Sequence, residues 1–251
     1  MTSIAISSIV FACVFGGAVL GQFLRTALPQ PHLNSDSKDA VKVGMALVAT
    51  MAALVLGLLV SSAKGSFDAQ NTEQTEMSAK VVLLDRVLAH YGPDTKEPRD
   101  LLRSTVAAAL DRLRSNDRSS NSRLEPQVAG AESLFDQIQG LSPKDDVQRS
   151  LQARALSIAF DLQQTRWLMY EQGASAISLP LLIVLIFWLV ALFVSFGLFA
   201  PRNATVVGSF LIAALSVSGA IFLILEMYSP YAGLIQVSSA PLRAALSHLG
   251  R

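Results

Sequence analysis

The residue types suited to metal, phosphate or nucleophilic chemistry are few in this chain and do not gather. His32, His90 and His248 lie far apart in the sequence and show no metal-ligand spacing. Residues 62–66 read Ser-Ala-Lys-Gly-Ser, which is similar to part of a phosphate-binding loop but lacks its first glycine. The sequence also has no nucleophile elbow and no paired His-Glu element. We therefore expect no catalytic residue, no metal site and no cofactor, and a protein that is not an enzyme.

Two charged positions lie where apolar segments end, and there they can act on ions. Glu226 ends the last apolar segment, and an acid at a membrane boundary is a candidate functional residue. A helix C-terminus disfavours a carboxylate, which favours a cationic partner such as Arg166 or Arg243; the alternative is a carboxylate that simply meets water. Arg202 and Asn203 lie in a short turn, where they can attract anions or anchor the loop. Arg202, Asn203 and Glu226 are therefore candidate pore-mouth or pairing residues.

Small and hydroxyl side chains inside the apolar segments indicate helix packing. Gly17 and Gly21 are four residues apart, a spacing that lets two helices approach closely in lipid, either inside one bundle or between subunits. Cys13, the single cysteine, has no internal disulfide partner and is predicted to be a small buried hydrophobe. Hydroxyl groups in the second and fourth segments either line a wet path or bond back to the carbonyl four residues earlier. These are the hydroxyls of Thr50, Ser209, Ser216 and Ser218.

Four long apolar segments must position these residues. They cover residues 4–24, 41–60, 179–200 and 206–225, and their only charged side chain is that of Lys42. Each holds about the 20 residues that a helix rising 1.5 Å per residue needs to cross roughly 30 Å of hydrocarbon. No Lys or Arg precedes the first segment, so the charged start of a cleavable signal peptide is missing. The sequence therefore predicts an integral membrane protein with four transmembrane helices in two hairpins.

The remaining charge gathers between the second and third spans. Residues 64–166 hold 14 of the 20 Lys and Arg, and residues 68–171 hold 16 of the 19 Asp and Glu. This middle segment is close to neutral, so it offers no basic surface for nucleic acid. Because the number of predicted spans is even, we expect the N-terminus, the middle segment and the C-terminal tail on one side of the membrane.

Hydrophobic periodicity predicts that residues 63–177 form a helical extramembrane domain. The second span is expected to continue into it, because no proline interrupts the sequence between the start of that span and Pro93. Another helix is predicted over Val128–Gln139, and a long one is predicted to begin with Ser142 as its N-cap. The polar stretch Ser115–Gln127 is expected to be a mobile loop.

The domain organisation follows from these segments, and the fold class is all-α. We expect a transmembrane hairpin over residues 1–62, the helical domain over 63–177, a second hairpin over 178–228 and a short tail over 229–251. Leu242, Leu246 and Leu249 give this tail the pattern of a short amphipathic helix that lies on the membrane or on the domain.

Several stretches of the sequence carry a family resemblance. They are Tyr91-Gly92-Pro93, Leu141-Ser142-Pro143 with Gln148-Arg149, Thr165-Arg166-Trp167, residues 195–203 (SFGLFAPRN), residues 219–226 (GAIFLILE) and residues 238–242 (SSAPL). With them the chain resembles a bacterial multi-pass membrane family, a domain of unknown function that is described as bestrophin-like. The resemblance covers nearly the whole chain. It implies four spans with a helical insert between the second and the third.

Two functions are compatible with the sequence and the resemblance. Bestrophins are pentameric anion channels with the same span order, so the resemblance implies a homo-oligomer in the bacterial inner membrane that conducts small anions. No residue of the chain matches their gating or calcium-binding residues, so no pore residue is transferred. The alternative is a non-conducting membrane interaction or sensor protein whose helical domain binds a partner or ligand. The lipid bilayer is an expected partner in both cases.

Overall fold

The structure is a computed structural model that describes residues 2–29, 35–114, 128–173, 178–229 and 233–250. The described residues form helices and no strand, which confirms the all-α fold class. They cluster into two compact units, described separately here. Unit 1 comprises Met1–Ser66 and Ala176–Tyr228, and unit 2 comprises Phe67–Ser175 and Ser229–Arg251.

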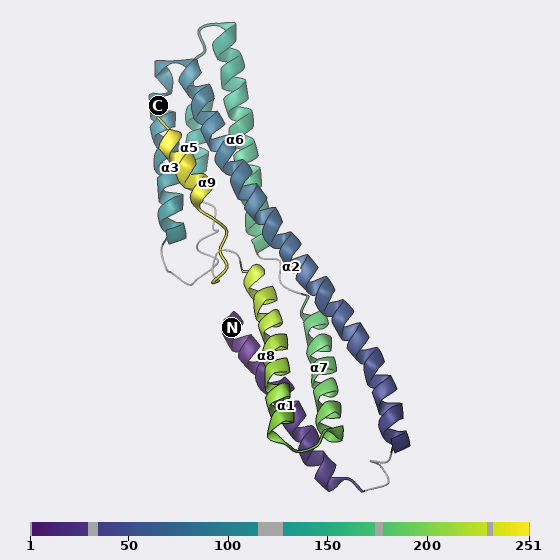
Figure 1. The fold of residues 1–251 in the computed structure, drawn as a ribbon. Helices are drawn as coiled ribbons and strands as arrows, with labels where there is room; N and C mark the ends of the chain where they lie inside the picture. Colours follow the sequence, from purple (N-terminus) through teal and green to yellow (C-terminus); the bar gives the residue numbers. More distant parts are fainter. Residues whose placement is uncertain (1, 30–34, 115–127, 174–177, 230–232, 251) are drawn as a thin grey trace. The chain divides into compact units, whose positions relative to one another are not determined.

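Unit 1 contains four helices that are long and apolar enough to cross a membrane, as the sequence predicts. They are α1 (Ser3–Ala27), the first part of α2 (Ser35–Tyr91), α7 (Leu179–Phe199) and α8 (Ala204–Met227). In Figure 1, α1 lies beside α7 and α8, and both of these helices contact it. The shared core of the unit is mostly aliphatic, with Val14, Leu185, Ile221 and Ile224 fully enclosed.

Glycines set the distance between α1 and α7. A Cβ atom added to Gly21 would lie 2.1 Å from the carbonyl oxygen of Val194, and one added to Gly197 would lie 2.0 Å from that of Ala18. Gly17 is tight rather than blocked, with the carbonyl oxygen of Val190 at 3.2 Å. Both glycines of the predicted pair therefore face another helix of the same chain. Helices in lipid are not held together by hydrophobic attraction, so the van der Waals contacts that this close approach allows stabilise the pair.

Unit 2 is a bundle built on the second part of α2. Its other elements are the 3₁₀ turn Pro93–Thr95, α3 (Lys96–Arg114), α5 (Val128–Gln139), α6 (Asp146–Gly173) and α9 (Ala240–His248). The core gathers Leu84, Leu88 and Ile138, which are at most 1% exposed, with apolar residues from every one of these α-helices. α2 ends at Tyr91 because Gly92 takes φ +128°, a left-handed conformation that favours glycine, and Pro93 follows.

A buried ion pair joins two helices of unit 2. Asp85 on α2 is fully buried and accepts two hydrogen bonds from the Arg99 guanidinium on α3, at 2.8 and 3.1 Å. This bidentate contact further raises the pKa of Arg99, so the pair stays charged. The backbone N–H of Gly250 lies 3.4 Å from the same carboxylate, and Arg86 donates to the His248 carbonyl. The ion pair therefore also holds the C-terminal segment.

The structure confirms several predicted helices and corrects one boundary. α2 runs without a break from the second span to Tyr91, and α5 has the predicted bounds. The long helix α6 begins at Asp146 rather than after Ser142, because Asp145 takes the capping role. Its carboxylate accepts from the Gln148 N–H at 2.7 Å, while the Gln148 side chain accepts from the Lys144 N–H at 2.8 Å. Residues 115–127, the predicted loop, lie outside the described residues.

The two units divide the chain slightly differently from the predicted domains. The first boundary lies after Ser66 instead of residue 62, and the second after Ser175 instead of 177. The tail 229–251 groups with unit 2, because α9 buries Leu242 and Ala245 there. Its predicted amphipathic helix thus lies on the helical domain.

Candidate functional site

Two arginines link α1 to the turn between α7 and α8. Arg25, in the last turn of α1, donates to the carbonyl of Ala200 at 2.5 Å, and Arg202 in the turn donates to the Gln22 carbonyl at 2.6 Å. Arg202 also lies 3.5 Å from the Thr26 hydroxyl. Each guanidinium binds an oxygen in or next to the last two turns of a helix, where the helix dipole favours positive charge. We call this arrangement the arginine clasp.

Asn203, the neighbour of Arg202, begins the next helix. Its side-chain oxygen accepts a hydrogen bond from the Val206 N–H at 2.8 Å, which makes it the N-cap of α8. The structure therefore gives both members of the predicted Arg202-Asn203 pair a structural contact. The guanidinium of Arg202 stays exposed, so its charge remains available to ions in water.

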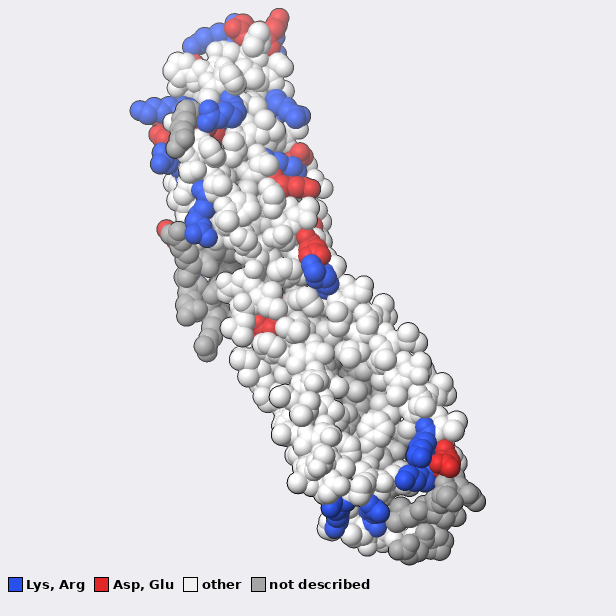
Figure 2. Space-filling model, in the orientation of Figure 1, with Lys and Arg blue, Asp and Glu red and all other residues white. Residues whose placement is uncertain are grey.

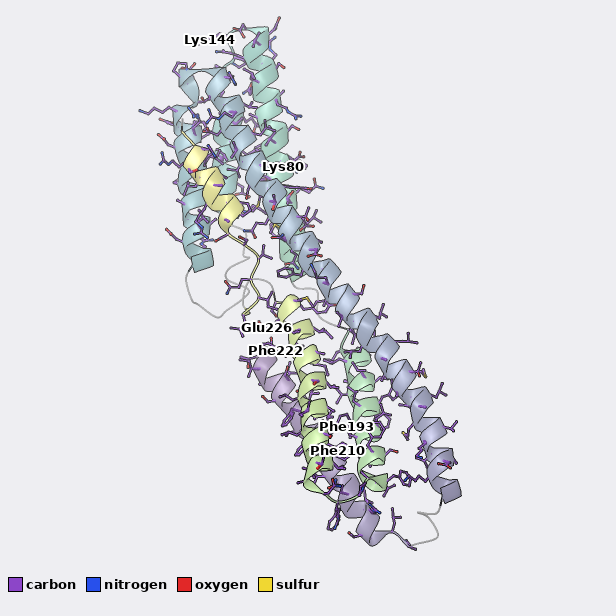
Figure 3. All side chains as sticks on the ribbon, in the orientation of Figure 1. Lys80, Lys144, Phe193, Phe210, Phe222 and Glu226 are labelled. Carbon is purple, nitrogen blue, oxygen red and sulfur yellow. The ribbon has the colours of Figure 1, made fainter. Side chains whose placement is uncertain are left out.

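Glu226, which is labelled in Figure 3, lies in the last turn of α8. Only 4% of it is exposed, so it is a buried carboxylate and not one that meets water at the headgroups. Two residues further on, Tyr228 shares a hydrogen bond of 3.0 Å with Ser62 of α2, which connects these two helices at the same end.

Arg166 and Arg243, the partners that the sequence suggests for Glu226, belong to unit 2. Burial, followed by the positive charge of Arg112, lowers the pKa of Arg166. Arg243 donates to the Ser239 hydroxyl at 3.1 Å in the first turn of α9. The neighbours of Arg166 and Arg243 named here therefore belong to unit 2 as well.

The hydroxyl groups of the spans bond to their own helices. Thr50 donates to the Ala46 carbonyl at 2.9 Å, and Ser216 donates to the Ile212 carbonyl at 2.8 Å. Ser209 and Ser218 make equivalent bonds to Thr205 and Leu215. These contacts favour the back-bonded alternative, and they leave no hydroxyl proton of the four aimed at a wet path. Cys13 lies exposed on α1, so its predicted burial is wrong; a thiol is apolar enough to face lipid there.

A groove lies between α2, α7 and α8 of unit 1. Its volume is about 640 Å³. The lining is Lys38, Lys42, Met45, Ala46, Ala49, Ser195, Phe196, Phe199, Ala200, Val206, Ser209 and Phe210. Figure 3 shows Phe210 beside Phe193 of α7, and their ring centroids are 6.4 Å apart. Lys38 and Lys42 are thus the charged residues of a lining that is otherwise nearly all apolar.

Arg25, Lys38, Lys42 and Arg202 flank one end of the spans of unit 1, while Lys64 follows the other end of the α2 span. Figure 2 shows a long uncharged surface over the spans, with blue Lys and Arg side chains at its lower end. Lys42 pairs with Asp39 at 3.2 Å, and both side chains are more than half exposed, so the pair is weak. The signal in the sequence is a lysine inside an otherwise uncharged segment with a second lysine one turn earlier, but spacing on one helix does not reveal a groove built from three.

The described residues include no group of three or more His, Cys, Asp or Glu side chains able to hold a metal ion together. Four apolar spans and a helical unit inserted between the second and the third define a multi-pass membrane protein. A family model, the Bestrophin-like domain, matches residues 12–242. The chain therefore belongs to the bestrophin-like family, as its sequence motifs suggest. No curated protein and no solved structure matches it significantly.

Proposed function

We propose that the protein is an oligomeric anion channel whose pathway runs between copies of the chain. The observation that carries the proposal is the match of the Bestrophin-like domain to residues 12–242, because bestrophins are anion channels built from several subunits. The arrangement of unit 1 supports a path between copies. Its four helices share a cluster of buried apolar residues, which are mostly aliphatic. Closely packed apolar side chains hold no water, so this cluster favours a path outside the single unit.

The span of α2 is the best candidate for the face that meets another copy. Only 11% of its apolar window is buried, compared with 22–33% in the other three spans. Its exposed residues include Thr50, Ala53, Gly57 and Ser61, which share one face of the helix at spacings of three and four. Lipid tails need no small side chains, whereas a neighbouring helix does, so this face favours contact with protein.

The arginine clasp supplies the charge that an anion pathway needs. Arg25, Arg202, Lys38 and Lys42 lie near the ends of the spans that they flank, and the start of α2 also carries Asp36 and Asp39. Cations at a mouth raise the local concentration of anions, and the effect weakens with added salt.

The test combines mass photometry with anion flux into liposomes. Wild type is expected to form an oligomer and to pass chloride. Gly57→Leu is expected to reduce either the oligomer or the flux, since a bulky side chain then enters the contact or the path. It leaves the single chain intact, because nothing lies within 4 Å of a Cβ atom added at Gly57. Gly16→Leu on α1, which has the same open space, is the matched control and should change neither.

Two results would contradict the proposal. A monomer that passes no anion in liposomes would favour the interaction or sensor function of the helical unit. A conducting oligomer that is indifferent to Gly57→Leu would place this face of α2 against lipid, and the path elsewhere.

A further inference from the structure

We propose that the groove between α2, α7 and α8 binds one anionic phospholipid of the bilayer, with an acyl chain against the aromatic lining and the phosphate at Lys38 and Lys42. This inference does not depend on anion conduction. It assigns to the groove an occupant that stabilises the packing of α2 on the rest of unit 1.

The shape and the lining of the groove fit a hydrocarbon chain. Its α2 wall runs from Lys38 to Ala49, which is about 16 Å of helix at 1.5 Å per residue, or roughly half the hydrocarbon thickness. The opposite wall presents Phe196, Phe199 and Phe210. The lining has two hydroxyl groups, those of Ser195 and Ser209. The Ser209 hydroxyl already donates to the Thr205 carbonyl, so it does not need a water molecule in the groove. Its volume of about 640 Å³ lies in the range of small-molecule sites.

The charge at the rim selects the headgroup. Lys38 and Lys42 are one helical turn apart, so their ammonium groups reach the same side of α2, where the apolar lining begins. Lysines at this depth extend their stems along apolar surface and hold the ammonium at the level of lipid phosphates. The partner of Lys42 in the structure is Asp39, an exposed carboxylate that a phosphate can replace.

The nearby arginines are not part of this groove. Arg25 and Arg202 are absent from its lining, and they donate to the Ala200 and Gln22 carbonyls. A zwitterionic lipid brings its own cation beside its phosphate and gains less from two lysines. A lipid with net negative charge, such as phosphatidylglycerol, therefore fits the site better than phosphatidylcholine does.

The test is native mass spectrometry of the full chain in detergent with graded phosphatidylglycerol or phosphatidylcholine. Two lysines near the surface predict a preference for phosphatidylglycerol on the order of 30-fold. The double variant Lys38→Gln/Lys42→Gln should lose this preference, and Lys38→Arg/Lys42→Arg should keep it. Lys80→Gln/Lys96→Gln removes the same charge from unit 2 and is the matched control, with no loss expected.

A second variant tests the apolar part of the site. Ala49→Phe fills the groove and should reduce retention of both lipids, while the melting temperature without lipid reports whether the variant has folded. Equal retention of the two lipids by wild type, or an unchanged preference in the double glutamine variant, would overturn the proposal. A rise in melting temperature with inorganic phosphate alone that is as large as the rise with phosphatidylglycerol would also overturn it, because the site would then bind a free anion rather than a lipid.

Discussion

At the scale of single residues, the polar and small side chains of unit 1 act mainly on helix ends and helix spacing. Arg25 and Arg202 bind carbonyl oxygens near the ends of α7 and α1, and Asn203 caps α8. Gly21 and Gly197 occupy positions where a methyl group would overlap a carbonyl. Residue types that suggest a pore mouth are therefore also residues that assemble the spans, and a variant must separate the two effects.

Gly21→Ala should destabilise the spans by about 1–3 kcal/mol, because the added methyl group would overlap the Val194 carbonyl and force α1 away from α7. Thermal unfolding in detergent measures the change. Gly16→Ala on the same helix meets nothing within 4 Å and should melt like wild type. Equal melting of the two variants would mean that α1 and α7 do not pack at this distance.

Arg202→Gln should lower stability by about 0.5–1.5 kcal/mol, since it removes the hydrogen bond to the Gln22 carbonyl. Salt separates this contact from a long-range field, because screening at 1 M reduces the Debye length to about 3 Å. The loss of stability should persist at 1 M salt, while any effect on anion flux should fade. Lys42→Gln is the control, because the contact of Lys42 with Asp39 lies within a single helix. A stability loss that disappears in salt would argue against the clasp.

At the scale of elements, the sequence pattern predicts helices well where periodicity and breakers agree. The absence of proline between residue 41 and Pro93 predicts the uninterrupted α2, and the bounds of α5 follow from polar flanks. Ser142 is a reasonable N-cap by type, but Asp145 and Gln148 together satisfy two backbone donors. The Asp145 carboxylate accepts from the Gln148 N–H, and the Gln148 side chain accepts from the Lys144 N–H. Such competition between two adequate caps is decided by tertiary contacts, such as that of Gln148 with the Tyr91 carbonyl, which a local pattern does not contain.

Leu242→Ala should destabilise unit 2 by about 2–5 kcal/mol, because Leu242 of α9 is buried in the core and a cavity would remain. Hydrogen exchange over residues 240–248, together with thermal unfolding, measures the loss. Leu234→Ala removes the same atoms from a side chain that is 78% exposed, and it should change little. Rapid exchange of α9 already in wild type would show that the tail does not dock on unit 2.

At the scale of the whole molecule, the sequence predicts the number of spans but not their contacts. Bilayer length and the lack of charge identify the four helices. The burial of Glu226 and the groove at Lys38 depend on where neighbouring helices end, which hydropathy does not report. Likewise, the spacing of Gly17 and Gly21 predicts a close contact without naming the partner, and the structure identifies α7 of the same chain.

The length of α2 bears on the topology of the chain. Its 57 residues extend about 85 Å, far more than roughly 30 Å of hydrocarbon, so a helix that crosses with its apolar span must extend well beyond the membrane toward Tyr91. In a Cys13→Ser background, an impermeant maleimide should label Asp39→Cys and Ala204→Cys from one face of the membrane. Thr72→Cys and Asp100→Cys should be labelled from the other, because the apolar span of α2 separates them from Asp39. Labelling of positions 39 and 72 from the same face would show that this span does not cross.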